Sequence, residues 1–127
     1  MAIIHTRIDR DQDLTINTAE GLLTIEDIMA AVNTYLAGET TAKVLWDFCR
    51  ADGAGIKLEE VIQFQETVRR LAPAAPKRQV AIVVARDIGF GLSRMAETYA
   101  DMAGVVADYY VTRSLEEAMD WLGVPME

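Results

Sequence analysis

The sequence contains one cysteine and one histidine among its 127 residues. The single cysteine, Cys49, cannot form an intrachain disulfide, which is typical of proteins from a reducing compartment. The single histidine, His5, cannot build a metal site alone, and no partner for nucleophilic or acid–base catalysis accompanies either residue in the sequence. We therefore expect a cytoplasmic protein that is not an enzyme and that uses no metal and no other cofactor.

Long apolar runs and positive charge are also scarce. The longest strictly apolar run, residues 80–85, has six residues, whereas a membrane-spanning helix needs about 20. The sequence has 12 Lys and Arg against 20 Asp and Glu, a net charge of -8, and a nucleic-acid-binding surface needs clustered positive charge. Membrane insertion and nucleic-acid binding are therefore not expected.

The composition that is present fits one domain over residues 1–127. Hydrophobic residues make up 51% of the chain and charged residues 25%, the balance of a soluble globular protein. The length falls within the usual range of about 100–150 residues for a single domain. Such a chain builds a core without disulfides or metals.

Apolar periodicity predicts an α/β fold with the element order β-β-α-β-α-β-α-β-α. Strands are expected at residues 3–8, 14–18, 42–48, 80–85 and 106–111, and helices at 24–38, 58–71, 88–103 and 114–123. Alternation of strand and helix after an initial hairpin predicts a mostly parallel five-stranded sheet with an antiparallel edge hairpin. The expected apolar stripes are Ile25, Ile28, Met29, Val32, Tyr35 and Leu36 on the first helix; Leu58, Val61, Ile62, Val68 and Leu71 on the second; and Ile88, Leu92, Met95, Ala96, Tyr99, Met102 and Ala103 on the third.

Two loops at the expected carboxyl ends of parallel strands hold candidate binding residues. The first follows Asp47 and contains Asp52, Gly53 and Gly55 ahead of a helix, where free backbone N–H groups favour anions. The second site consists of Arg86, Gly89, Gly91, Ser93 and Arg94. Open α/β sheets bind ligands at this edge. The alternatives are a plain strand-to-helix loop for the first segment and, for the second, glycines that pack Phe90 and an Arg94 that pairs with Glu97.

Other residues favour structural roles. Asp9, Asp11 and Asp13 imitate the start of a calcium loop, but Leu14 stands where that loop needs glycine, so a hairpin turn is expected. Cys49 follows the third strand, where the neighbouring Arg50 could lower its thiol pKa, although a buried or half-buried thiol is the default for a lone cysteine. Tyr109 and Tyr110 are expected on opposite faces of the last strand.

Several segments resemble the SpoIIAA-like group, small bacterial proteins related to the STAS domain of sulfate transporters and anti-sigma-factor antagonists. The resemblance rests on the element order and on GLLTIEDI (21–28), VLWDF (44–48), VAIVVARDIGFGLSRM (80–95) and SLEEAMDWLG (114–123). It implies a compact α/β domain that binds partners instead of catalysing a reaction. The antagonists carry a phosphorylated serine after the third strand, and Gly53 stands at the matching position. The resemblance thus implies no such phosphorylation switch here.

Two functions follow as hypotheses. The first is a stand-alone SpoIIAA-like interaction module that binds a protein partner or a second copy of itself. The alternative is a protein that binds a small anionic or lipid-like ligand at the carboxyl ends of the parallel strands.

Overall fold

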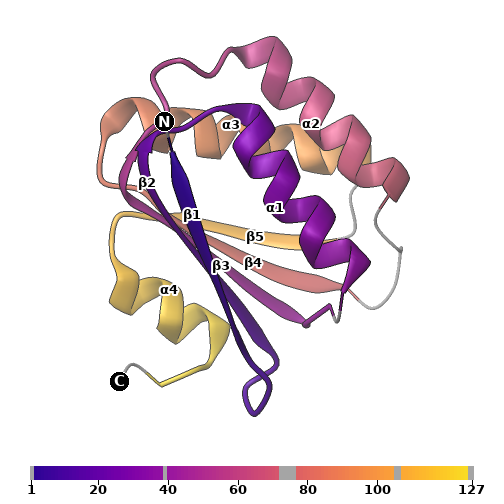
Figure 1. The fold of residues 1–127 in the computed structure, drawn as a ribbon, viewed down its shortest axis with the longest axis vertical. Coiled ribbons are helices and arrows are strands. Elements are labelled where there is room, and N and C mark those ends of the chain that lie inside the picture. The colour runs from indigo at the N-terminus through magenta and orange to yellow at the C-terminus, as the bar shows by residue number, and fades with distance from the viewer. Residues whose placement is uncertain (1, 39, 72–76, 105–106, 126–127) are drawn as a thin grey trace.

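The computed structural model describes residues 2–38, 40–71, 77–104 and 107–125, with the side chains of Ile88 and Ala103 outside the described part. Within these residues one sheet separates three helices on one face from a single helix on the other (Figure 1). The strands are β1 (Ile3–Asp9), β2 (Leu14–Leu22), β3 (Lys43–Asp52), β4 (Arg78–Val83) and β5 (Ala107–Thr112). The helices are α1 (Ile25–Ala37), α2 (Leu58–Leu71), α3 (Asp87–Ala103) and α4 (Leu115–Leu122).

The sheet confirms the predicted fold class. Its five strands lie in the order β1-β2-β3-β4-β5, with β1 antiparallel to β2 and every later pair parallel. Asp13, which has a φ of 53°, closes the β1–β2 hairpin, and Gln12 bonds the carboxylate of Asp9 through both its backbone and its side-chain amide. The acidic segment is therefore the expected turn.

Strands β2 and β3 are longer than predicted. Their pairing continues beyond an irregularity between Thr18 and Glu20 and joins Leu22 to Asp52. The sequence breaks its alternation at this bulge, so the prediction ended both strands too early. The predicted start of the last strand, Val106, lies outside the described residues.

The face of the sheet that carries α4 is densely packed. Leu45, 2% exposed, lies among apolar side chains of the strands and of α4. The cluster comprises Leu14, Leu45, Ala81, Val83, Ala118, Met119, Leu122 and Val124. Ser114 begins α4 by accepting a hydrogen bond from the Glu117 amide at 3.2 Å, and Gly123, with a φ of 73°, ends it. Both caps agree with the sequence prediction.

The three helices on the other face correct part of the predicted stripes. Leu58 and Leu71 of α2 and Met95 and Met102 of α3 are exposed. Helix α3 instead turns small side chains inward, with Ser93 and Ala100 buried. Small residues allow close approach of α3 to its neighbours, and the bulkier methionines lie on the exposed side of the helix. None of the helices in the described part is both long and apolar enough to cross a membrane.

Candidate functional site

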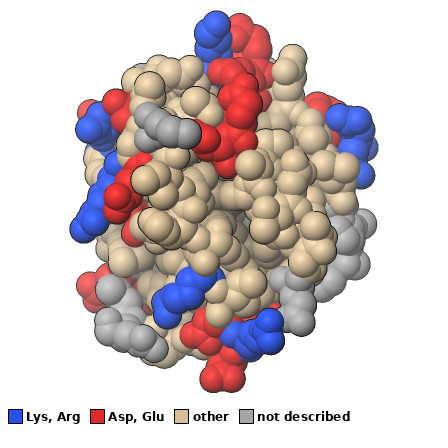
Figure 2. Space-filling model, in the orientation of Figure 1, with Lys and Arg blue, Asp and Glu red and all other residues tan. Residues whose placement is uncertain are grey.

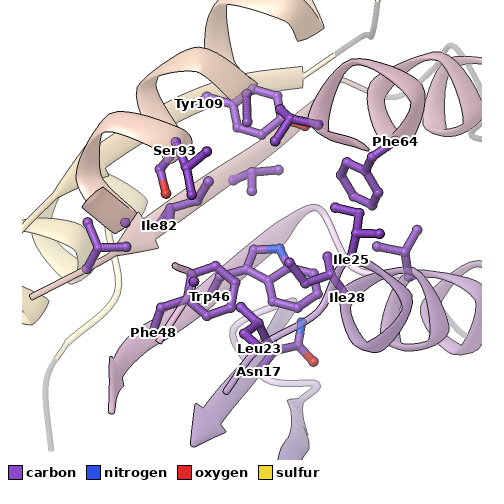
Figure 3. Close-up of a pocket in the computed structure, with 18 of the residues that line it drawn as sticks. Asn17, Leu23, Ile25, Ile28, Trp46, Phe48, Phe64, Ile82, Ser93 and Tyr109 are labelled. Atoms are coloured by element: carbon purple, nitrogen blue, oxygen red, sulfur yellow. The ribbon is translucent and has the colours of Figure 1, made fainter. Parts of the chain in front are cut away.

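A cavity of about 180 Å³ lies between the sheet and helices α1, α2 and α3. Figure 3 shows side chains from the strands and from the helices pointing into this shared space. The sheet side is formed mainly by Val44, Trp46, Phe48, Val80, Ile82 and Val84, and the helix side by Ile25, Ile28, Val32, Leu36, Val61, Phe64, Val68 and Leu92. The walls are therefore overwhelmingly aliphatic and aromatic.

The cavity lies where α1 closes only partly on the sheet. None of the side chains of α1 is fully buried, although its apolar stripe faces inward. Ile28 and Val32 contact the sheet cluster around Trp46 but stay half-buried, and together with Ile25 and Leu36 they border the cavity. Protein interiors are normally filled to crystal-like density, so an apolar space of this size between two apolar surfaces is unusual.

Polar groups are few in the cavity wall, and most have partners. Asn17 accepts a hydrogen bond from the Thr6 hydroxyl at 2.7 Å. The Tyr35 hydroxyl donates to the Thr41 carbonyl oxygen and accepts from Arg78 Nε at 3.0 Å. The Arg78 guanidinium also lies 5.7 Å from the centre of the Tyr35 ring. This buried cation is therefore held by Tyr35 at the wall.

The cavity reaches the carboxyl edge of the sheet, where the sequence places its candidate residues. Gly53, Arg86, Gly89 and Ser93 border it. Asp52 joins them through an ion pair of 3.1 Å between its Oδ2 and Arg86 Nη1, and its Oδ1 accepts from the Ala54 amide at 3.0 Å. The structure thus brings five of the nine predicted site residues together.

The remaining four predicted residues lie away from the cavity. Asp47 alternates with Trp46 and Phe48 along β3, so its side chain lies on the other face of the sheet, where it accepts from the Cys49 amide at 3.0 Å. Gly55 and Gly91 are exposed, and a Cβ at either would meet nothing within 4 Å. Arg94 is exposed and pairs with Glu97 at 3.5 Å, as the structural alternative predicted.

The charges at this edge do not form an anion site. Arg86 is paired with Asp52, and Arg113 bonds Asp87 of α3 and lies 4.8 Å from the centre of the Phe90 ring. Helix α2 begins at Leu58, beyond the glycine-rich loop, and the Lys57 amide in front of it donates to Glu60 Oε1 at 2.9 Å. The broad side of the molecule, seen in the orientation of Figure 1, is largely uncharged, and most of its charged side chains lie toward the rim (Figure 2).

Cys49 is exposed, which corrects the expectation of a buried or half-buried thiol. Partial burial, together with a hydrogen bond and charge repulsion from Asp47, raises the pKa of Cys49 to about 11. Arg50 does not lower it, because its guanidinium pairs with Glu20 at 3.3 Å. A thiol with so high a pKa is a poor nucleophile at neutral pH.

We expect alkylation of Cys49 by iodoacetamide to be slow at pH 8 and to accelerate as the pH rises toward 11. Asp47→Asn removes the charge that disfavours the thiolate, so it should lower the thiol pKa and speed alkylation at pH 8 severalfold. Asp52→Asn, the same charge change farther along β3, is the matched control. An identical pH–rate profile for Asp47→Asn and the unaltered protein would contradict this assignment.

No group of three or more His, Cys, Asp or Glu side chains in the described ranges is arranged to hold a metal ion. Among the described residues that border the cavity, no acid and base are paired near a nucleophile. The arrangement offers an apolar space for a molecule.

Three polar residues of the cavity, Gln65, Arg78 and Tyr109, were not among the predicted site residues. A signal for Gln65 was present, because it stands four residues after Val61 and three before Val68 on the apolar stripe of α2. A polar residue at an apolar stripe position of a helix marks either a buried hydrogen bond or a ligand contact.

Comparisons with known proteins agree with this fold. No family profile and no curated protein matches the sequence. A solved structure from Shewanella loihica PV-4, an uncharacterized protein of the DUF3478 family with a SpoIIAA-like fold, matches with a TM-score of 0.59 at 20% identity. The match covers 95% of this chain and 93% of that one. At this identity the likeness shows the fold alone, and this chain therefore has a SpoIIAA-like fold.

Proposed function

We propose that this protein binds a small, uncharged and mainly apolar molecule in the cavity between the sheet and α1, α2 and α3. The observation that carries the proposal is the open apolar space itself. Helix α1 turns its apolar stripe toward the sheet yet buries none of its side chains fully. A bound molecule supplies the missing contacts and removes that apolar surface from water.

The size of the cavity limits the ligand. An engineered apolar cavity of about 150 Å³ takes up benzene or xenon, whereas pockets for drug-sized ligands measure about 300–1,000 Å³. The volume here, about 180 Å³, therefore suits one aromatic ring or a short branched alkyl group. Burial of such a molecule gives a binding free energy of about 4–5.5 kcal/mol, which corresponds to a Kd of roughly 0.1–1 mM.

The charges favour a neutral ligand. Both arginines that border the cavity are engaged, Arg78 with Tyr35 and Arg86 with Asp52. A carboxylate or phosphate entering the apolar part would lose its hydration without gaining a dedicated cation. This narrows the ligand hypothesis drawn from the sequence, which named an anionic or lipid-like molecule at the strand ends.

A titration with single-ring compounds tests the proposal. Trp46 borders the cavity, whereas Trp121 stacks on Tyr110 at 5.4 Å on the α4 side of the sheet. In a Trp121→Phe background, benzene, toluene, fluorobenzene and phenol should change the fluorescence of Trp46, and a ligand at ten times its Kd should stabilise the fold by about 1.4 kcal/mol. If no compound changes the fluorescence or the melting temperature, the protein does not have this function.

The protein-binding role expected from the sequence stays a prediction. One observation favours a partner surface: Met95 and Met102 lie on the outer side of α3, and the latter is 75% exposed. Methionine side chains adapt to varied partners. The cavity nevertheless gives the stronger argument, because it defines both a volume and a chemistry.

A further inference from the structure

Gln65 is the most deeply buried polar side chain that borders the cavity. It projects from the inner face of α2 and is 1% exposed. Val61 and Val68, one turn away on either side, border the same cavity. An amide in such apolar surroundings normally has all of its hydrogen bonds satisfied.

One half of this amide is satisfied and the other is not. Gln65 Nε2 donates to the Ala96 carbonyl oxygen of α3 at 3.1 Å. That bond fixes the orientation of the amide, because a flipped amide would place two acceptor oxygens together. The other atom, Oε1, has no hydrogen-bond partner among the described residues.

None of the described residues that border the cavity around Gln65 is an Asp or a Glu. Tyr109 lies beside Gln65: burial raises the pKa of that phenol, a hydrogen bond from the Gln65 side chain partly offsets this, and the charge of Asp101 raises the pKa further. Tyr109 therefore stays protonated and neutral at physiological pH. Because no described carboxylate borders the cavity, a cationic donor would find no counter-charge at its wall, so the matching donor is a neutral O–H or N–H.

Building on the proposed function, we infer that Gln65 Oε1 selects, among ring-sized ligands, those that carry one neutral hydrogen-bond donor. The ligand class is a small aromatic alcohol or a ring N–H compound, with its apolar part against the cavity walls and its donor directed at Gln65. One ligand can make both the apolar contacts and the hydrogen bond, because Gln65 and the apolar walls border the same cavity.

Phenol and fluorobenzene test this selection, because they match in shape and only phenol has a donor. Phenol gives up hydrogen bonds to water on entry, so a cavity without an acceptor favours fluorobenzene. We expect the unaltered protein to favour phenol. Gln65→Met keeps the length of the side chain and removes its polar atoms, and it should shift the ratio of the two Kd values toward fluorobenzene by about tenfold. Gln63→Met, at an exposed position on the same helix, should leave the ratio unchanged.

The outcomes separate this inference from the proposed function. If neither compound binds the unaltered protein, the proposed function fails. If both bind and Gln65→Met leaves the ratio of Kd values unchanged, Gln65 does not select the ligand and only this inference fails. Should Gln65→Met not fold, the unaltered protein still decides: fluorobenzene bound more tightly than phenol overturns the selection, and phenol bound more tightly supports it.

Discussion

Leu45→Ala will lower the free energy of unfolding by about 3 kcal/mol, whereas Leu36→Ala will lower it by less than about 1 kcal/mol. The two substitutions remove the same atoms on opposite sides of the sheet, Leu45 from β3 and Leu36 from α1. Leu45 is 2% exposed within the cluster under α4, so its loss leaves a hole in dense packing. Leu36 borders the existing cavity and is only half-buried, so fewer contacts disappear with it.

Urea unfolding of the two variants and the unaltered protein measures this difference directly. If the free energy of unfolding falls with urea concentration at a similar slope in all three proteins, the variants unfold from equally compact states. Equal losses of stability at the two positions would contradict the account, because they would mean that α1 packs on the sheet as tightly as α4 does.

Val32→Phe will weaken binding of single-ring ligands at least tenfold and, at the same time, stabilise the unliganded protein by about 0.5–2 kcal/mol. Val32 points from α1 into the cavity, and a phenyl ring there occupies the space of the ligand. The phenyl ring contacts wall side chains that have no neighbouring atoms across the empty cavity. Most substitutions that abolish binding destabilise a protein. Weaker ligand binding together with higher stability is therefore a specific sign that the new ring fills the cavity.

Asn33→Phe is the matched control, because it adds the same ring at the next, exposed position of α1. It should leave both the melting temperature and the Trp46 titration nearly unchanged. Binding that persists at full strength in Val32→Phe would place the ligand elsewhere, and a loss of stability would show that the space is too small for a ring.

The fold could be read from the sequence because its signals are local. The alternation at residues 14–18 and the cap residues Thr24 and Ser114 each depend on near neighbours along the chain, and the structure confirms them. The lengths of β2 and β3 depend on pairing between distant segments, joined at Leu22 and Asp52. No local pattern carries that information, so the prediction stopped at the bulge.

The site, like the fold, was predicted only in part. The carboxyl edge was predicted because parallel strands end there, and Asp52 and Arg86 do meet at it. The cavity was not predicted, because a stripe such as Ile28 and Val32 marks which side of a helix is apolar and not how closely it approaches the sheet. A filled core and an open one have the same pattern in sequence.

A crystal of the protein held under xenon gas gives the most direct test of the central claim. Xenon enters apolar cavities of this size and is seen directly in electron density. We expect a xenon atom enclosed by Ile28, Trp46 and Phe64, between α1 and the sheet (Figure 3). Helices packed against the sheet with no xenon between them would contradict it.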